Sequence, residues 1–162
     1  MADSLKWRMA RAEHCLVRLL AEHSDDDFAL ALQFGIDVGI LGRALLRDPT
    51  LRPEVDAFVA RTSDLVARSA KLALWIHRVA RAADNRSSET DYYTNALAMR
   101  SDVEFARQLY EGSAQARSRL DDFDLTDVDQ DLKEWGRVQY LESVPDDIPS
   151  SHVWWHQSLS KR

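Results

Sequence analysis

The chain has 162 residues, a formal net charge of −6 and one cysteine, Cys15. That length suits a single domain with its own core, one cysteine excludes an internal disulfide, and the acidic balance argues against binding to nucleic acid through overall charge. The acidity is local, because residues 1–120 carry 17 acidic and 17 basic side chains, whereas residues 121–147 carry ten acidic side chains against two basic ones.

The first two predicted helices begin near Ser4 and Asp25, and the second runs to about Arg47. The first has apolar residues at spacings of four and three, as one face of a helix requires. The second contains the most apolar run of the chain, residues 28–42, which is interrupted by polar side chains and is too short to span a bilayer. We therefore predict a core helix, although a strand over residues 34–41 would have the same local pattern.

Small and charged residues on the second helix indicate its surroundings. Gly35, Gly39 and Gly42 remove side chains from one sector, which predicts the close approach of another helix. Asp37 is a carboxylate on an otherwise apolar helix. It is a candidate either for a buried functional carboxylate or for a paired residue at the edge of the core.

Residues 51–83 carry the longest regular pattern of the chain. Apolar and small residues recur there at spacings of four and three: Leu51, Val55, Phe58, Thr62, Leu65, Ser69, Leu72, Ile76, Val79 and Ala83. The pattern predicts one helix about 50 Å long, with partner helices along its whole length. Beside it lies a row of cations and one aromatic that could follow phosphates: Arg61, Arg68, Lys71, Trp75, Arg78 and Arg81.

Two further helices complete the predicted fold. One ends near Leu120, and the pair Ser101 and Glu104 has capping-box spacing that predicts a kink within it. The other begins at Thr126 and is shorter, with one apolar face made of Val128, Leu132, Trp135 and Val138. The prediction is an all-α, single-domain bundle of four to five mostly antiparallel helices with two long central helices, over residues 1–144. Prolines set off an aromatic C-terminal tail, residues 145–162.

Two surfaces are candidates for binding a protein partner. The acidic segment includes Asp122, Asp124 and Asp127, but the glycine and the final glutamate of a calcium loop are missing from the register, so a docking or solvated surface is favoured. The tail contributes Val153, Trp154 and Trp155. Tryptophan rings are costly to leave in water, so this pair predicts either a partner-binding surface or a plug on the core.

Few residues have the spacing of a chemical site. His152 and His156 are four apart and could face one metal ion, but two ligands do not make a site. Arg8 and His14 have a spacing similar to that in helical ribonucleases of the HEPN family, yet Met9 replaces the usual polar residue and the pair lies on the first helix. No histidine has an acidic residue three positions before it, as di-iron bundles require.

These observations predict a non-catalytic protein–protein interaction module without a cofactor. It would act as an adaptor, an assembly subunit, or a small acidic inhibitor or immunity-type protein, and would bind another protein or itself rather than a membrane. The N-terminal residues lack the basic and apolar parts of a secretion signal, which predicts a cytoplasmic location. The alternatives are a nucleic-acid-associated subunit of a larger complex that uses the cation row, and an enzyme of unrecognised type.

Overall fold

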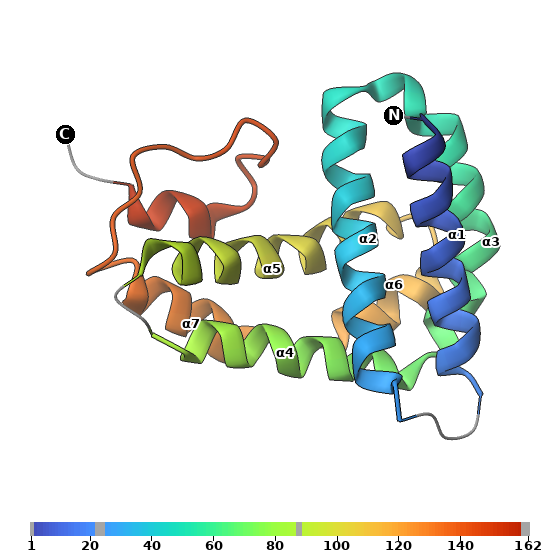
Figure 1. Ribbon diagram of the computed structural model, residues 1–162, viewed down its shortest axis with the longest axis horizontal. Helices are drawn as coiled ribbons and strands as arrows, with labels where there is room; N and C mark the ends of the chain where they lie inside the picture. Colours follow the sequence, from blue (N-terminus) through green and yellow to red (C-terminus); the bar gives the residue numbers. More distant parts are fainter. Residues whose placement is uncertain (1, 22–24, 87–88, 160–162) are drawn as a thin grey trace.

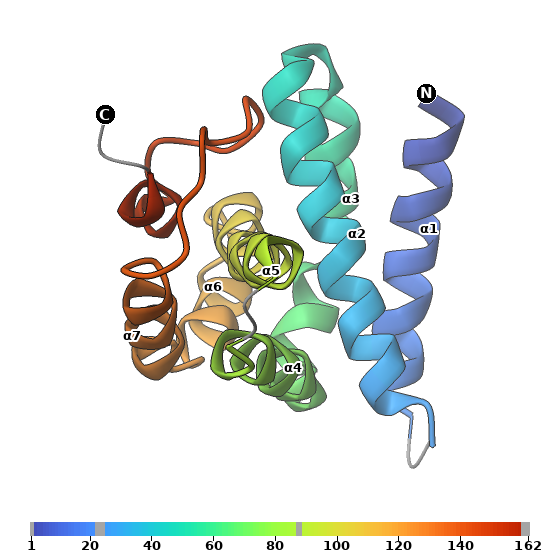
Figure 2. The ribbon, with the colours of Figure 1, turned by 60° about the vertical axis from the view of Figure 1, so that its left-hand side comes forward.

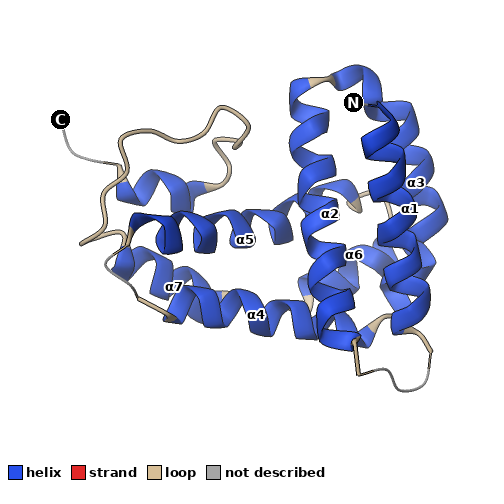
Figure 3. Ribbon diagram, in the orientation of Figure 1, coloured by secondary structure: helices blue, strands red, loops and turns tan. Residues whose placement is uncertain are grey.

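The computed structural model describes residues 2–21, 25–86 and 89–159. Within these ranges the regular elements are helices, apart from a single bridge between Leu141 and Leu159 (Figure 3). The α-helices are α1 Ala2–Leu19, α2 Asp27–Arg47, α3 Arg52–Arg68, α4 Ala73–Asp84, α5 Thr90–Leu109, α6 Ala114–Asp121 and α7 Thr126–Trp135. Short 3₁₀-helices cover η1 Pro49–Leu51, η2 Ala70–Leu72 and η3 Val153–Ser158. The all-α prediction is confirmed, and the strand alternative for residues 34–41 is wrong because they lie inside α2.

The described ranges contain seven α-helices rather than four to five, because two predicted long helices are broken. The predicted helix over residues 51–83 ends at Arg68, where Ser69 leaves the helical conformation with φ −85° and ψ 81°. No proline or glycine stands at this break, so the sequence pattern runs through it without interruption. The other break separates α5 from α6 after Leu109, whereas α5 continues without a break through Ser101, where the sequence predicted a kink or a break.

Two groups of helices meet at α2. Figure 1 shows α1, α2 and α3 running up and down beside one another, with α4 and α5 leaving them at a steep angle. Figure 2 shows α2 between α1 and the pair α4 and α5. The residue contacts agree, since α2 packs mainly on α1, α5 and α4, while α6 packs on α3 and α7 on α4. The helix with the most apolar sequence therefore occupies the centre of the fold.

The predicted close approach at the glycines of α2 is confirmed. A Cβ atom added at any of the three would overlap a side chain of a neighbouring helix: at Gly35 the Trp75 ring, at Gly39 the Asp102 carboxylate, and at Gly42 the Phe105 ring. Two of these side chains belong to α5 and one to α4. The small residues thus let both helices cross α2 closely, at a separation that larger side chains would prevent.

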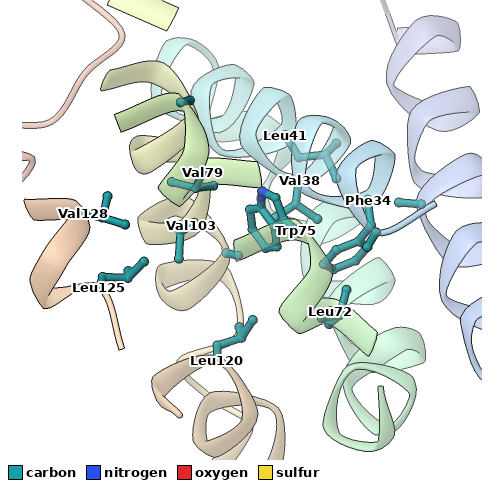
Figure 4. Packing of buried hydrophobic residues seen from close by; sticks show 14 of the residues in the cluster. Phe34, Val38, Leu41, Leu72, Trp75, Val79, Val103, Leu120, Leu125 and Val128 are labelled. Atoms are coloured by element: carbon teal, nitrogen blue, oxygen red, sulfur yellow. The ribbon is translucent and has the colours of Figure 1, made fainter. Parts of the chain in front are cut away.

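The core is continuous through both groups of helices. Figure 4 shows Trp75 of α4 beside Phe34 and Val38 of α2, and to the left of Trp75 in this view it shows Val103, Leu120 and Val128 of α5, α6 and α7. The rings of Phe34 and Trp75 meet edge to face, with centroids 6.1 Å apart. This contact explains why α4 cannot simply continue α3, because only the break at Ser69 lets the chain turn and bring Trp75 onto α2.

By length and composition alone, α2 is a helix that could cross a membrane, with 21 residues, but half of its most apolar window is buried within the protein. The sequence argument counted only the apolar run of residues 28–42, whereas the helix that contains this run is longer. The structure uses α2 as the predicted core helix. The cytoplasmic location stays a prediction.

Candidate functional site: a groove along α2

An apolar row lies on the solvent side of α2. Phe28, Leu32, Ile36 and Ile40 follow one another at intervals of four residues, which places them in one slightly twisted line along the helix. Phe28 and Ile36 are 40% and 38% exposed, and the other two are half-buried. A contiguous exposed row of large apolar side chains is a feature of interaction surfaces rather than of an ordinary protein surface.

Three hollows adjoin along this row and form what we call the α2 groove. The middle hollow has a volume of about 540 Å³ and is walled by α2, α4 and α5, with Ile36, Trp75 and Met99 among its lining residues. It shares Arg78 with the hollow beside Phe28 and shares Ile40 and Arg43 with the hollow between the ends of α1 and α2. From Phe28 to Arg47 the groove follows 20 residues of α2, about 28 Å at the rise of an α-helix.

An ion pair lines the middle of the groove. Arg43 Nη1 donates to Asp102 Oδ1 at 2.6 Å, and its Nη2 donates to the carbonyl oxygen of Ala98 at 3.3 Å. The guanidinium also lies 5.1 Å from the centre of the Phe105 ring. Burial raises the pKa of Asp102 to about 7, and the attraction of Arg43 opposes that rise.

Two arginines of α4 lie at the Phe28 end of the groove. Arg78 and Arg81 line the hollow there together with Asp84 and Asn85. Neither guanidinium has a carboxylate oxygen within 4.0 Å among the described residues. The groove thus combines an apolar floor with two cations that form no ion pair within the described residues. An apolar floor beside such cations is an arrangement suited to binding.

The predicted cation row does not form one surface. The break between α3 and α4 divides it, and Trp75 is buried in the core. Three of its cations are paired within the protein: Arg61 with Glu13 at 3.5 Å, Arg68 with Asp64 at 2.9 Å, and Lys71 with Asp27 at 2.8 Å. Only Arg78 and Arg81 remain together, and they belong to the α2 groove.

Asp37 is buried and joins α1 to α2. Arg11 donates to it twice, from Nε at 2.8 Å and from Nη2 at 2.5 Å, and Arg8 Nη1 donates at 3.2 Å. Trp7 covers the outer side of this cluster, with its ring 4.1 Å from the Arg11 guanidinium. Of the two alternatives that the sequence left open for Asp37, the structure therefore shows the carboxylate that is paired with arginine. Since Arg8 is engaged here and His14 is exposed, the structure does not bring the ribonuclease-like pair into a site of its own.

The tail returns to α5 and is fixed there by one hydroxyl group. Ser101 Oγ accepts a hydrogen bond from Trp155 Nε1 at 2.8 Å and another from Trp154 Nε1 at 3.2 Å. Because an indole can only donate, both lone pairs of the oxygen are used, and its own proton is directed to His152 Nδ1 at 3.0 Å. All four side chains are buried. We call them the Ser101 hub.

The hub corrects the prediction of a tryptophan surface. Trp154 and Trp155 are only 5% and 2% exposed, so their rings pack on the protein's own core, while Val153 alone is 56% exposed. The guanidinium of Arg100 covers the Trp154 ring at 4.1 Å. The sequence allowed the tail to be either a partner-binding surface or a plug on the core, and in the structure it is a plug on the core. The physical reason is that α5 supplies a buried acceptor for both indole N–H groups.

His152 and Ser101 resemble a nucleophile and its base in distance only. Both residues are fully buried, and the hydroxyl is already committed to three partners, so no substrate reaches it. Burial, together with the charges of Arg100 and Arg43, lowers the pKa of His152 to about 4 and keeps the ring neutral. His156 is exposed, so the two histidines do not share a site, and the described ranges contain no group of three or more His, Cys, Asp or Glu side chains placed for a metal ion.

The predicted acidic surface is exposed. Asp122, Asp124 and Asp127 all face solvent. Asp124 accepts a hydrogen bond from the backbone N–H of Thr126 at 3.0 Å, and its hydrogen bonds with Thr126 lower the pKa of the carboxyl. This contact precedes the first turn of α7, whose start at Thr126 the sequence predicted correctly. The partner-binding role of these carboxylates stays a prediction.

Sequence reasoning missed the α2 groove. Its signal was present, since the second predicted helix is apolar on more sides than one partner helix can cover, but periodicity does not say which side stays open. The hollows arise only where three helices meet. Comparison of the chain with protein-family models, curated protein sequences and solved structures finds no match.

Proposed function

We propose that this protein is a non-catalytic interaction module whose α2 groove holds one amphipathic helix of a partner protein. The supporting observation is the exposed row of Phe28, Leu32, Ile36 and Ile40, which lies in a continuous groove with arginines at its edges. Burial of such a row against a partner would remove large apolar side chains from water, and this term dominates most protein associations. In this role the protein would serve in the cytoplasm as an adaptor, an assembly subunit or a small acidic inhibitor.

A helix suits the groove better than an extended peptide. Extended peptides bind by adding to the edge of a sheet, and the described chain offers no such edge. The groove is about 28 Å long, which matches a helix of about 18 residues. Its floor is a row at four-residue spacing, and such rows are the ridges onto which a second helix packs.

Nucleic acid and catalysis fit the groove less well. Phosphates gain nothing from a floor of isoleucine, leucine and methionine side chains, and a net charge of −6 repels a polyanion. The titratable pair in the middle hollow, Arg43 and Asp102, is fixed by mutual hydrogen bonding and by Ala98. It can tune the charge of the site but presents no reactive atom for bond chemistry.

The test is site-specific crosslinking in cells that express the full chain. A photoreactive phenylalanine analogue replaces Asn95, an exposed residue that lines the middle hollow. The crosslink is compared in three backgrounds: the otherwise unchanged chain, Ile36→Asp in the groove, and Leu46→Asp as the control. Leu46 also lies on α2 and is 50% exposed, but it does not line the groove.

We expect one crosslinked partner, mapped to a helical segment, in the unchanged chain and in Leu46→Asp but not in Ile36→Asp. A buried aspartate in the contact would lower the affinity at least tenfold, because a charge in an apolar contact is strongly disfavoured. The proposal is refuted if the crosslinks are to lipid, if they persist in Ile36→Asp, or if no crosslink forms.

A further inference from the structure

We infer that the helix held in the α2 groove is acidic, and that its carboxylates pair with Arg78 and Arg81 at the Phe28 end. This inference rests on the proposed function, because it assigns the chemistry of the occupant of the same groove. It commits to a protein segment with apolar residues on one face and glutamate or aspartate along the edge that meets α4.

Arg78 and Arg81 are unusual among the arginines of the described ranges, because neither forms an ion pair there. Among the 16 arginines in the described ranges, 12 lie within 4.0 Å of a described carboxylate. Of the other four, Arg119 donates to the carbonyl oxygen of Ala67 and Arg137 is exposed away from the groove. Arg78 and Arg81 are the two that adjoin one another and line a hollow. Their charges are therefore available to an external ligand.

The position of these arginines links the charge to the apolar row. They are three residues apart on α4, so they lie on one side of the helix, and Arg78 lines both the end hollow and the middle hollow. Asp84 lines the end hollow too, but its carboxylate is beyond 4.0 Å from both guanidinium groups. A helix lying on Phe28 and Leu32 would pass beside both arginines.

At the opposite end of the groove the arginines already have carboxylate partners. Arg8 pairs with Asp37, and Arg47 pairs with Asp147. In the middle, Arg43 faces Asp102. The strongest demand for negative charge is therefore at the α4 end. A docking helix would also displace water from the rim arginines, which makes a carboxylate opposite them favourable and a lysine unfavourable.

The experiment uses two synthetic amphipathic peptides of equal length as probes. They share one leucine-rich face and differ only along its edges, where one peptide has glutamate and the other has lysine. Affinity for the full chain is measured by fluorescence anisotropy at low and physiological salt, with an oligothymidylate of similar length as a nucleic-acid probe. The variants are Arg78→Gln with Arg81→Gln, Ile36→Asp, and the charge-matched control Arg52→Gln with Arg137→Gln, which alters two exposed arginines outside the groove.

We expect the glutamate peptide to bind at least tenfold more tightly than the lysine peptide. The α4 double variant should lose that tenfold preference and its salt dependence, whereas the control double variant should change affinity less than twofold. Equal or tighter binding of the lysine peptide would overturn the inference while leaving the groove as a helix site. Tighter binding of the oligothymidylate, lost in the α4 variant, would replace the protein ligand by nucleic acid.

The proposed function itself fails in a different way. In that case neither peptide binds, or both bind unchanged to Ile36→Asp, because the contact then lies elsewhere. Circular dichroism melts of each variant check that it is folded, and the substitutions are at exposed or half-buried positions that leave the core intact.

Discussion

The Ser101→Ala variant tests how the tail is held. The substitution removes one oxygen atom from a buried position where it accepts from Trp154 and Trp155 and faces His152. Both indole N–H groups would then lose a buried acceptor that no group in alanine replaces, which is the costly way to lose a hydrogen bond.

The magnitude follows from the number of hydrogen bonds removed. Loss of a buried partner costs about 1–3 kcal/mol, so the three contacts of the Ser101 hydroxyl with His152, Trp154 and Trp155 together predict a loss of about 4 kcal/mol in the free energy of unfolding. That is a large share of the roughly 5–15 kcal/mol that stabilises a domain of this size. The assay is urea unfolding followed by far-ultraviolet circular dichroism.

A matched control and a double variant complete the test. Ser63→Ala removes a hydroxyl that donates to the carbonyl oxygen of Val59 within α3, and it should cost about 0.5 kcal/mol or less. Trp155→Phe removes one of the two indole donors, so combining it with Ser101→Ala should recover about 1–3 kcal/mol relative to additivity. If Ser101→Ala unfolds within 0.5 kcal/mol of Ser63→Ala, on the scale of a surface substitution, the reasoning about the hub is wrong.

The remaining predictions concern pH and packing. His152 has a pKa lowered from 6.5 to about 4, so its stabilisation is complete above pH 6.5 and is lost as the pH falls toward 4, by up to about 3 kcal/mol; His152→Asn should remove this contribution in unfolding measured across pH and leave the opposing slope of Asp102. Asp102 changes stability with pH in the opposite direction, since its pKa is raised from 3.8 to about 7 and its stabilisation is lost as the pH rises through that range. In Asp102→Asn the free energy of unfolding should therefore follow His152 alone between pH 4 and 6.5 and fall as the pH falls. Gly39→Ala should destabilise by about 1–3 kcal/mol, because the added Cβ overlaps the Asp102 carboxylate, and a neutral result in thermal melts would mean that α5 can move aside. Leu72→Ala should cost about 2–5 kcal/mol as a fully buried position, and a loss below 0.5 kcal/mol in urea would contradict its place in the core.

The sequence by itself determined the helical character and several element boundaries. Periodic apolar residues, the break at Asp48 and Pro49, and the start of α7 at Thr126 are local signals, and each depends on residues within a few positions of one another. The glycines of α2 also belong here, because a sector without side chains allows only close packing. The glycines did not identify the partner helices, because no residue near them in the sequence specifies which helix packs there.

The tertiary structure alone decided where the helices break and which surfaces stay open. No proline or glycine stands at the break at Ser69. The break follows from the packing of Trp75 against Gly35, because Trp75 could not reach Gly35 from a straight helix. The burial of Trp154 and Trp155 depends on Ser101, more than 50 residues earlier in the chain. The α2 groove likewise exists because α4 and α5 cover part of an apolar helix and leave the rest exposed. These outcomes are set by competition among distant contacts, and hydrophobic burial is non-directional, so local periodicity cannot choose among them.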